Sequence, residues 1–180
     1  MRKLSRAKSS WLRAACVGLT ILFPTAAWSQ TQDAARLSPQ NAERARQALI
    51  TWFECEECEG GELKAVTRYG QAVRPNLIGA LNEGTSPASR ELLRRQMEVR
   101  YDELVEVGKK NPNIKLGSSK DDFVKMYLSN FDAQYRVRAA QALGAIGGTR
   151  AREALQAALG KAERADVQAT IRETLSKMRR

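Results

Sequence analysis

The residues best suited to chemistry are two cysteines in a short acidic run, Glu54-Cys55-Glu56-Glu57-Cys58-Glu59. Thiols three residues apart can meet on one helical turn or on the turn that ends a helix. They can close a local disulfide, exchange with another disulfide, or bind a soft metal ion. The third cysteine, Cys16, lies in a segment that has the layout of an export signal. Cys55 and Cys58 are therefore the two cysteines expected in the mature protein.

We favour the local disulfide, which would fasten the end of a helix to the Gly60-Gly61 turn. Its loop is short, so its stabilisation should fall below the approximately 3 kcal/mol of a 15-residue loop. Thiol–disulfide exchange is an alternative that the flanking carboxylates oppose, because like charges disfavour a thiolate. Metal binding is a second alternative, but no further CxxC motif or His completes a set of four ligands. Haem attachment through a CxxCH motif is excluded, because Glu59 stands where His is needed.

The chain of 180 residues contains no histidine. This excludes Ser-His-Asp and Cys-His nucleophile systems, zinc or haem sites with His ligands, and imidazole pH switches. Aromatic residues make up only 6% of the sequence, which leaves little for a base-stacking surface. We therefore expect a protein that is not an enzyme, with no catalytic residue, metal or cofactor.

The first 29 residues have the layout of a secretory signal peptide. Basic residues without any acidic residue precede an apolar run at 14–23, and Ala27 and Ser29 supply small side chains before a cut at Gln30. The apolar run spans about ten residues, whereas a membrane-spanning helix needs about 20. We expect cleavage after Ser29 by the general secretion route, a periplasmic or secreted location, and no integral membrane segment.

Removal of this signal changes the charge balance of the chain. The signal holds five of the 30 Lys and Arg residues and none of the 20 Asp and Glu residues, which leaves 25 basic against 20 acidic residues. A modest basic excess spread along a chain is typical of a solvated surface, so no nucleic-acid partner is expected. Binding of an anionic polymer of the cell envelope stays open as an alternative, and such binding would weaken with salt.

The mature chain has helical periodicity throughout, after a polar leader at residues 30–37 that we expect to be flexible. Ser38-Pro39 and Ser86-Pro87 are typical helix starts, with a capping hydroxyl followed by proline at the first helical position. No segment shows the sustained alternation of a strand. The sequence predicts an all-α domain over residues 38–180 with about seven or eight helices.

Further helix boundaries follow from caps and glycines. We expect one helix to end at Gly108, a loop over residues 109–118, and separate helices to begin at Ser119 and at Asp132.

Two stretches of the chain are alike. Residues 65–81 and 142–159 each contain a helix, a turn glycine (Gly70 or Gly147), and a second helix with leucines four residues apart. Repetition of a helix pair indicates an α-solenoid, in which each repeat buries its apolar face against its neighbours.

The motif that carries the best repeat is Asp132-Ala-Gln-Tyr-Arg-Val137-Arg138-Ala139-Ala140-Gln-Ala142-Leu143-Gly144-Ala-Ile146-Gly147-Gly148. It resembles the HEAT repeat in the form found in phycobilisome-lyase-like repeats, and a partial copy opens at Asp166 with Gln168 in place of the usual Arg. The resemblance is best over residues 132–175. It implies a short HEAT-like α-solenoid of stacked helix pairs in an exported bacterial protein, and a binding scaffold more than any particular activity.

The resemblance also implies structural roles within the repeat. In such repeats an acidic residue caps the helix, and the arginine bridges to neighbouring backbone or acidic groups. The positions that we expect to be structural are Asp132, Val137, Arg138, Ala140, Leu143, Gly144, Ile146, Gly147, Leu155 and Leu159.

Aromatic side chains gather at the start of the best repeat. Core packing is the default interpretation of such a cluster, and a partner-binding patch is the alternative. We expect an exported, non-catalytic scaffold that presents a groove to a protein partner. The candidate contacts are Tyr127, Phe131, Tyr135, Arg136 and Arg150. The sequence indicates neither the identity of the partner nor the oligomeric state.

Overall fold

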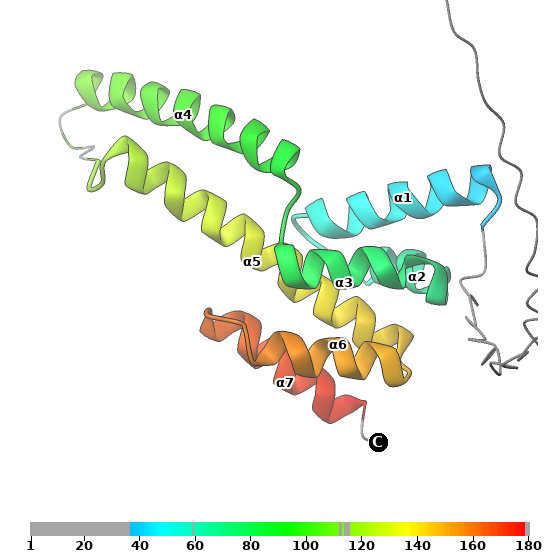
Figure 1. The fold of residues 1–180 in the computed structure, drawn as a ribbon. Coiled ribbons are helices and arrows are strands. Elements are labelled where there is room, and N and C mark those ends of the chain that lie inside the picture. The colour runs from blue at the N-terminus through cyan, green and yellow to red at the C-terminus, as the bar shows by residue number, and fades with distance from the viewer. Residues whose placement is uncertain (1–36, 59, 112, 114–115, 179–180) are drawn as a thin grey trace, which may run out of the picture. The chain divides into compact units, whose positions relative to one another are not determined.

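The computed structural model describes residues 37–58, 60–111, 113 and 116–178. The predicted signal peptide and residues 30–36 of the leader lie outside this part of the chain. All described residues belong to one compact unit, Asp33–Arg180. Within them every regular element is helical and no strand occurs, so the all-α prediction is confirmed. Figure 1 shows α1 (Pro39–Glu54), α2 (Gly61–Thr67), the 3₁₀ helix η1 (Gly70–Val73), α3 (Arg74–Glu83), α4 (Pro87–Lys110), α5 (Lys120–Ile146), α6 (Thr149–Leu159) and α7 (Ala165–Lys177).

The helix starts follow local capping rules. The hydroxyl oxygens of Ser38, Ser86 and Ser119 each accept a hydrogen bond from the backbone N–H three residues later, at 3.3, 3.1 and 3.1 Å. Proline follows the first two of these serines, where its missing N–H leaves no helical bond unmade. These starts were predicted from the sequence and are confirmed.

The long helix α5 lies at the centre of the described contacts. Its first half pairs with α4, and its second half packs against α3, α6 and α7 (Figure 1). At 1.5 Å per residue its 27 residues span about 40 Å, so a single helix reaches both groups of neighbours.

The prediction that a new helix begins at Asp132 is wrong, because α5 runs through this position without a break. The carboxylate of Asp132 caps another segment instead. Its Oδ1 accepts hydrogen bonds from the N–H of Thr85, at 3.2 Å, and from the Thr85 hydroxyl, and its Oδ2 pairs with Arg90. Gly84 has φ +79°, and a Cβ atom there would lie 3.1 Å from Asp132 Oδ1, so glycine allows this close approach.

Two other boundaries differ from expectation. Helix α4 continues two residues past Gly108 to Lys110, because glycine weakens a helix without ending it. Leu37, the last residue of the predicted leader, is half-buried against the main core.

Two apolar clusters hold the described helices together. The main core joins α1, α2, α3, α5, α6 and α7, and its fully buried side chains include Leu77, Leu143, Leu155 and Ile171. A smaller cluster joins α4 to the first half of α5. It contains Phe123, Val124 and Leu128 with the half-buried Leu93, Met97, Tyr101 and Leu104. Because α4 has no buried residue, the α4–α5 hairpin is stabilised by a much smaller core than the rest.

The positions of the repeat motif lie in this main core or at its edge. Ala140, Leu143 and Leu155 are buried, and Val137, Ile146 and Leu159 pack against the core as half-buried residues. Gly147 ends α5 with φ +71°. A Cβ atom at Gly144 would overlap Cγ2 of the buried Thr174, so α5 and α7 approach closely at a position where only hydrogen fits.

Candidate functional site

The cysteine pair lies where α1 ends. Cys55 is the C-cap residue of α1, the Sγ atoms of Cys55 and Cys58 lie within bonding distance, and their Cα atoms are 5.7 Å apart. Both cysteines are half-buried against the main core, while Glu56 and Glu57 are exposed. This arrangement fits the predicted local disulfide, which stays a prediction until the thiols are titrated.

Arg138 of α5 binds the end of α1. Its Nη1 donates to the carbonyl oxygens of Trp52, at 3.0 Å, and Phe53, at 2.6 Å, and its Nη2 donates to the carbonyl oxygen of Cys55. The indole Nε1 of Trp52 donates in return to the carbonyl oxygen of Arg138, at 3.0 Å. The last carbonyls of a helix have no partner within it, so one guanidinium caps α1. Burial lowers the pKa of Arg138.

Two neighbours of Arg138 strengthen the same contact. Gln134 Nε2 donates to the Phe53 carbonyl oxygen at 3.2 Å, and the Tyr135 hydroxyl donates to Glu54 Oε1 at 3.0 Å. The rings of Tyr135 and Phe53 are stacked with centroids 4.6 Å apart. Burial, followed by the hydrogen bond to Glu54, raises the pKa of Tyr135. The repeat motif on α5 thus holds the acidic cysteine segment in place.

A hollow of about 920 Å³ adjoins this junction. Its walls include Trp52, Cys58, Leu63, Val137 and Met178. Among the described residues, no group of three His, Cys, Asp or Glu side chains comes together as a metal site would require.

The predicted aromatic patch is divided between the surface of the α4–α5 hairpin and the main core. Tyr127 belongs to the hairpin, where it is 41% exposed and its ring centroid lies 4.7 Å from that of Phe123. Phe131 and Tyr135 lie in or against the main core, with ring centroids 5.0 Å apart. Only Tyr127 of the three is placed to meet a partner through an exposed ring.

A second hollow, of about 680 Å³, lies between α4, α5 and the start of α7. We call it the charged groove. Its lining includes the buried apolar side chains Val124, Leu128, Ala133 and Val167. Its charged lining residues are Arg90, Arg94, Glu98, Asp121, Lys125, Asp132, Arg136, Glu163 and Arg164. Of the basic contacts proposed from the sequence, Arg136 lines this groove, and Arg150 is exposed in the first turn of α6, outside the lining.

Three contacts fix the register of α4 against α5. Arg90 pairs with Asp132 at the end near the main core, and Lys120 Nζ pairs with Asp102 Oδ2 at 2.7 Å near the far end. The Tyr101 hydroxyl donates to the Ser118 carbonyl oxygen at 2.8 Å. The helices are therefore antiparallel. Moving a given number of residues towards the C-terminus of α4 corresponds to moving the same number towards the N-terminus of α5.

This register sorts the charges along the groove. Arg94 lies at the level of Leu128, so it falls with Arg90 and Arg136 at the end near the main core. Glu98 lies at the level of Val124, so it falls with Asp121 at the opposite end. Near the main core the lining thus has four arginines against the carboxylates of Asp132 and Glu163, and we call this the arginine end. The opposite end has Glu98 and Asp121 against Lys125, and we call it the carboxylate end.

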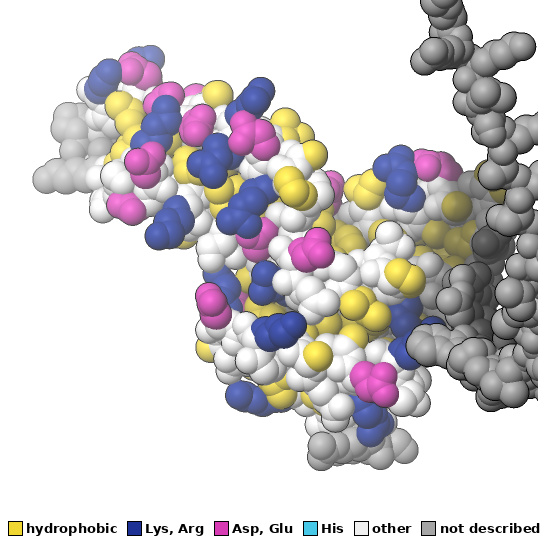
Figure 2. All heavy atoms as spheres, in the orientation of Figure 1, with side chains coloured by type: hydrophobic (Ala, Val, Ile, Leu, Met, Phe, Trp, Pro, Cys, Tyr) yellow, Lys and Arg dark blue, Asp and Glu magenta, His cyan; other side chains and the backbone are white. Residues whose placement is uncertain are grey.

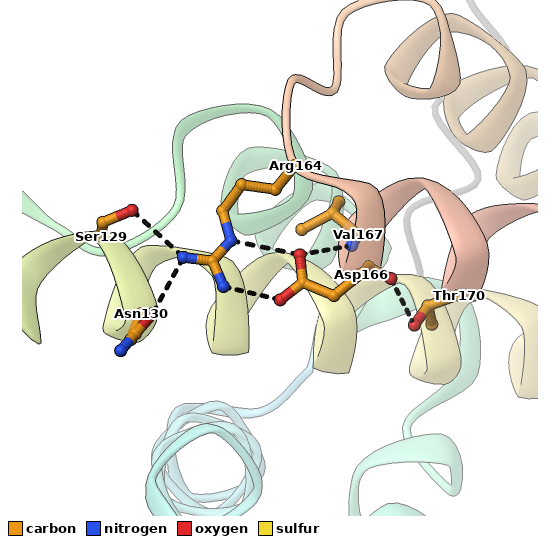
Figure 3. Close-up of polar contacts among 6 residues, drawn as sticks. All are labelled: Ser129, Asn130, Arg164, Asp166, Val167 and Thr170. Carbon is orange, nitrogen blue, oxygen red and sulfur yellow. Dashed lines mark hydrogen bonds and ion pairs between the residues drawn. The ribbon is translucent and has the colours of Figure 1, made fainter. Parts of the chain in front are cut away.

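The loop between α6 and α7 forms one wall of the groove and is fastened to α5 (Figure 3). Arg164 donates to Ser129 Oγ at 3.2 Å, to Asn130 Oδ1 at 2.9 Å, and to both carboxylate oxygens of Asp166 at 3.1 and 2.7 Å. Asp166 Oδ1 also accepts from the N–H of Val167 at 2.8 Å. The Arg164 guanidinium, more than any other cause, lowers the pKa of Asp166.

Sequence reasoning missed most of the residues of this groove. Arg90, Arg94 and Arg164 stand in segments that look like ordinary solvated helix ends and faces. The available signals were Arg136 and Asp132, which were singled out from the sequence and which line the groove. A third was Asp166, which holds Arg164 and opens the partial second copy of the repeat. The groove exists only because α4 folds back along α5, and no local pattern reports that pairing.

Comparisons with known proteins identify the repeat itself. The model of the PBS lyase HEAT-like repeat matches residues 135–161, which contain the second half of α5 and all of α6. The predicted HEAT resemblance is confirmed, over a shorter segment than the 132–175 expected. No curated protein and no solved structure matches the chain. Among the described helices, none is long and apolar enough to cross a bilayer.

Proposed function

We propose that this chain, which carries a PBS lyase HEAT-like repeat, is a non-catalytic scaffold that binds a segment of another protein in the charged groove. The observation that carries the proposal is a hollow of about 680 Å³ with an apolar floor and a rim of long charged side chains. Protein interfaces combine a desolvated apolar centre with a polar rim in this way. We also propose that the protein acts after export, in the periplasm or outside the cell.

The hairpin beside the groove offers additional contact surface. Leu92 and Val99 on α4 are each 60% exposed, and Met126 and Tyr127 on α5 are also exposed. Figure 2 shows apolar side chains between charged ones over this part of the molecule. A partner that enters the groove could extend along the hairpin and cover some of these side chains.

Binding of an anionic polymer has less support from the structure. The basic residues of α4 alternate with carboxylates on the same helix. Arg95 pairs with Glu91 at 3.0 Å and Lys109 with Glu106 at 2.6 Å. Exposed charges neutralised in this way give little net attraction for a polyanion.

Thiol–disulfide exchange also has less support. Cys55 follows directly on the C-terminal end of α1, where the helix dipole disfavours a negative charge, and Glu56 and Glu57 lie beside it. Both effects oppose the thiolate that exchange requires.

Photo-crosslinking in cells tests the scaffold. A photoreactive amino acid replaces exposed Lys125 in the groove, and the matched control carries it at Gln156, which is exposed on α6 outside the groove. We expect a discrete protein adduct from position 125 that is absent at position 156 and is lost when Arg94→Glu is added. Equal adducts at both positions, or none at position 125, would count against the groove as a binding site.

A further inference from the structure

The charged groove has an excess of positive charge at its arginine end and an excess of negative charge at its carboxylate end. Such a separation favours a partner whose own charges are separated in the complementary way. We propose that the groove binds an extended segment with carboxylates at one end, apolar residues in the middle and cations at the other end. This inference rests on the proposed scaffold function and adds the chemical class of the partner.

At the arginine end, the guanidinium groups that line the groove have carboxylate partners mostly outside it. Arg94 pairs with Glu91 at 3.7 Å, and Arg164 pairs with Asp166, and neither of these carboxylates lines the groove. Asp132 does line it, but its oxygens are used by Thr85 and Arg90, as described above. Glu163 also lines the groove beside Arg164, so the arginine end has four arginines against two lining carboxylates.

Arg136 adds an unused donor at this end. Its Nε is buried and makes no hydrogen bond to any described residue. Because this Nε is itself buried, a ligand meets only those parts of the Arg136 side chain that line the groove. Guanidinium groups bind carboxylates through paired hydrogen bonds, so a carboxylate is the group that suits this end.

At the opposite end, Glu98 and Asp121 line the groove with a single cation, Lys125. A polyanion would be repelled at this end, whereas a lysine or arginine of a partner would be attracted. The two ends therefore require opposite charges from one ligand.

The spacing of the two ends sets the length of the segment. The arginine end centres on the level of Asp132 and the carboxylate end between Asp121 and Val124, about ten residues apart along α5, or about 15 Å. An extended chain covers this distance in four or five residues. The buried side chains of Val124 and Leu128 form the floor of the groove beside Glu98 and Arg94, so the residues of the segment that bridge the two ends should be apolar.

Fluorescence anisotropy with two labelled synthetic peptides tests the inference. Both contain two glutamates, three apolar residues and two lysines, about seven residues in all, enough to span the groove. In the sorted peptide the glutamates lie at one end and the lysines at the other, and in the mixed peptide they alternate. At low ionic strength we expect the sorted peptide to bind about tenfold more tightly, a difference of about 1.4 kcal/mol.

Charge reversals in the protein make the test specific. Arg94→Glu with Arg136→Glu, or Glu98→Lys with Asp121→Lys, should each remove the preference for the sorted peptide. All four changes together should restore it, because the sorted peptide can then bind in the opposite direction. Because Arg94 is exposed on α4, Arg94→Glu alone reverses a charge of the groove without changing its buried wall. Arg172→Glu, at an exposed position of α7 outside the groove lining, is the matched control and should leave the preference for the sorted peptide unchanged.

The outcomes separate this inference from the scaffold. Equal affinities for the two peptides, or a preference that survives the charge reversals, would overturn the inference of sorted recognition. If the crosslink from position 125 still forms in that case, the scaffold stands without it. If neither peptide binds and no crosslink forms, both proposals fail.

Discussion

Replacing Arg138 by methionine tests how the repeat holds the cysteine segment. Methionine keeps an unbranched side chain of similar reach but has no N–H donors. The carbonyl oxygen of Phe53 retains the hydrogen bond from Gln134, so the oxygens of Trp52 and Cys55 lose the partner that Arg138 supplies. A hydrogen bond to a charged donor contributes about 1.5–3 kcal/mol. Because this junction is half-buried, the lower figure applies to each oxygen, and the expected loss is about 3 kcal/mol.

Urea unfolding followed by tryptophan fluorescence measures this loss. In protein that begins at Gln30, Trp52 is the sole tryptophan, and its indole nitrogen is bonded to the Arg138 carbonyl oxygen. The emission therefore reports on the junction itself. A loss of 3 kcal/mol is a large part of the 5–15 kcal/mol by which domains are usually stable.

Two variants make the result interpretable. Arg138→Lys keeps the charge but cannot reach all the carbonyls at once, so its loss should lie between those of the wild type and the methionine variant. Arg172→Met removes an exposed arginine of α7 and should cost less than about 0.5 kcal/mol. A loss below about 1 kcal/mol for Arg138→Met, with unchanged Trp52 emission, would refute the capping role.

Three further predictions concern packing, thiols and pH. Gly144→Ala should destabilise the protein by about 1–3 kcal/mol in thermal or urea unfolding, because its Cβ overlaps Thr174 Cγ2, and adding Thr174→Ser should restore most of the loss. Protein purified from the export compartment should have no titratable thiol at Cys55 or Cys58, and Cys58→Ser should cost about 2 kcal/mol or less, because the closed loop is short; two free thiols would contradict this. Asp166→Asn should lower the melting temperature at neutral pH. The lowered pKa of Asp166 means that its contribution is present above the ordinary value of 3.8 and is lost as pH falls through the lower folded value. The difference from wild type should therefore shrink below pH 3.8, and a difference that grows in acid would contradict the ion pair.

The sequence predicted those features that depend on neighbours along the chain. Helix starts at Ser38, Ser86 and Ser119 were readable because a capping oxygen bonds to the N–H three residues later. The cysteine pair at the end of a helix was readable for the same reason, since its two members are three residues apart.

Helix α5 shows a feature that interactions between neighbours along the chain do not predict. Asp132 has the residue type of a helix cap, and the sequence alone places a boundary there. Its carboxylate instead meets Thr85, 47 residues earlier in the chain, so its partner is chosen by the return of α4 along α5. Side chains packed on both sides of this point keep the helix continuous. Tyr127 and Tyr135, eight residues apart, consequently have different environments: Tyr135 is buried in the main core, and Tyr127 is exposed on the hairpin.

By itself, the sequence determined the helical class, the capped starts of the helices and the HEAT-like repeat. These depend on interactions within a few residues or on the period of the apolar side chains. Only the tertiary structure decided that Arg138 binds the end of α1, that Gly144 faces Thr174, and that the charges of α4 and α5 line one groove. The physical reason is that each of these contacts joins residues far apart in the chain, and the contact forms only when packing brings them together.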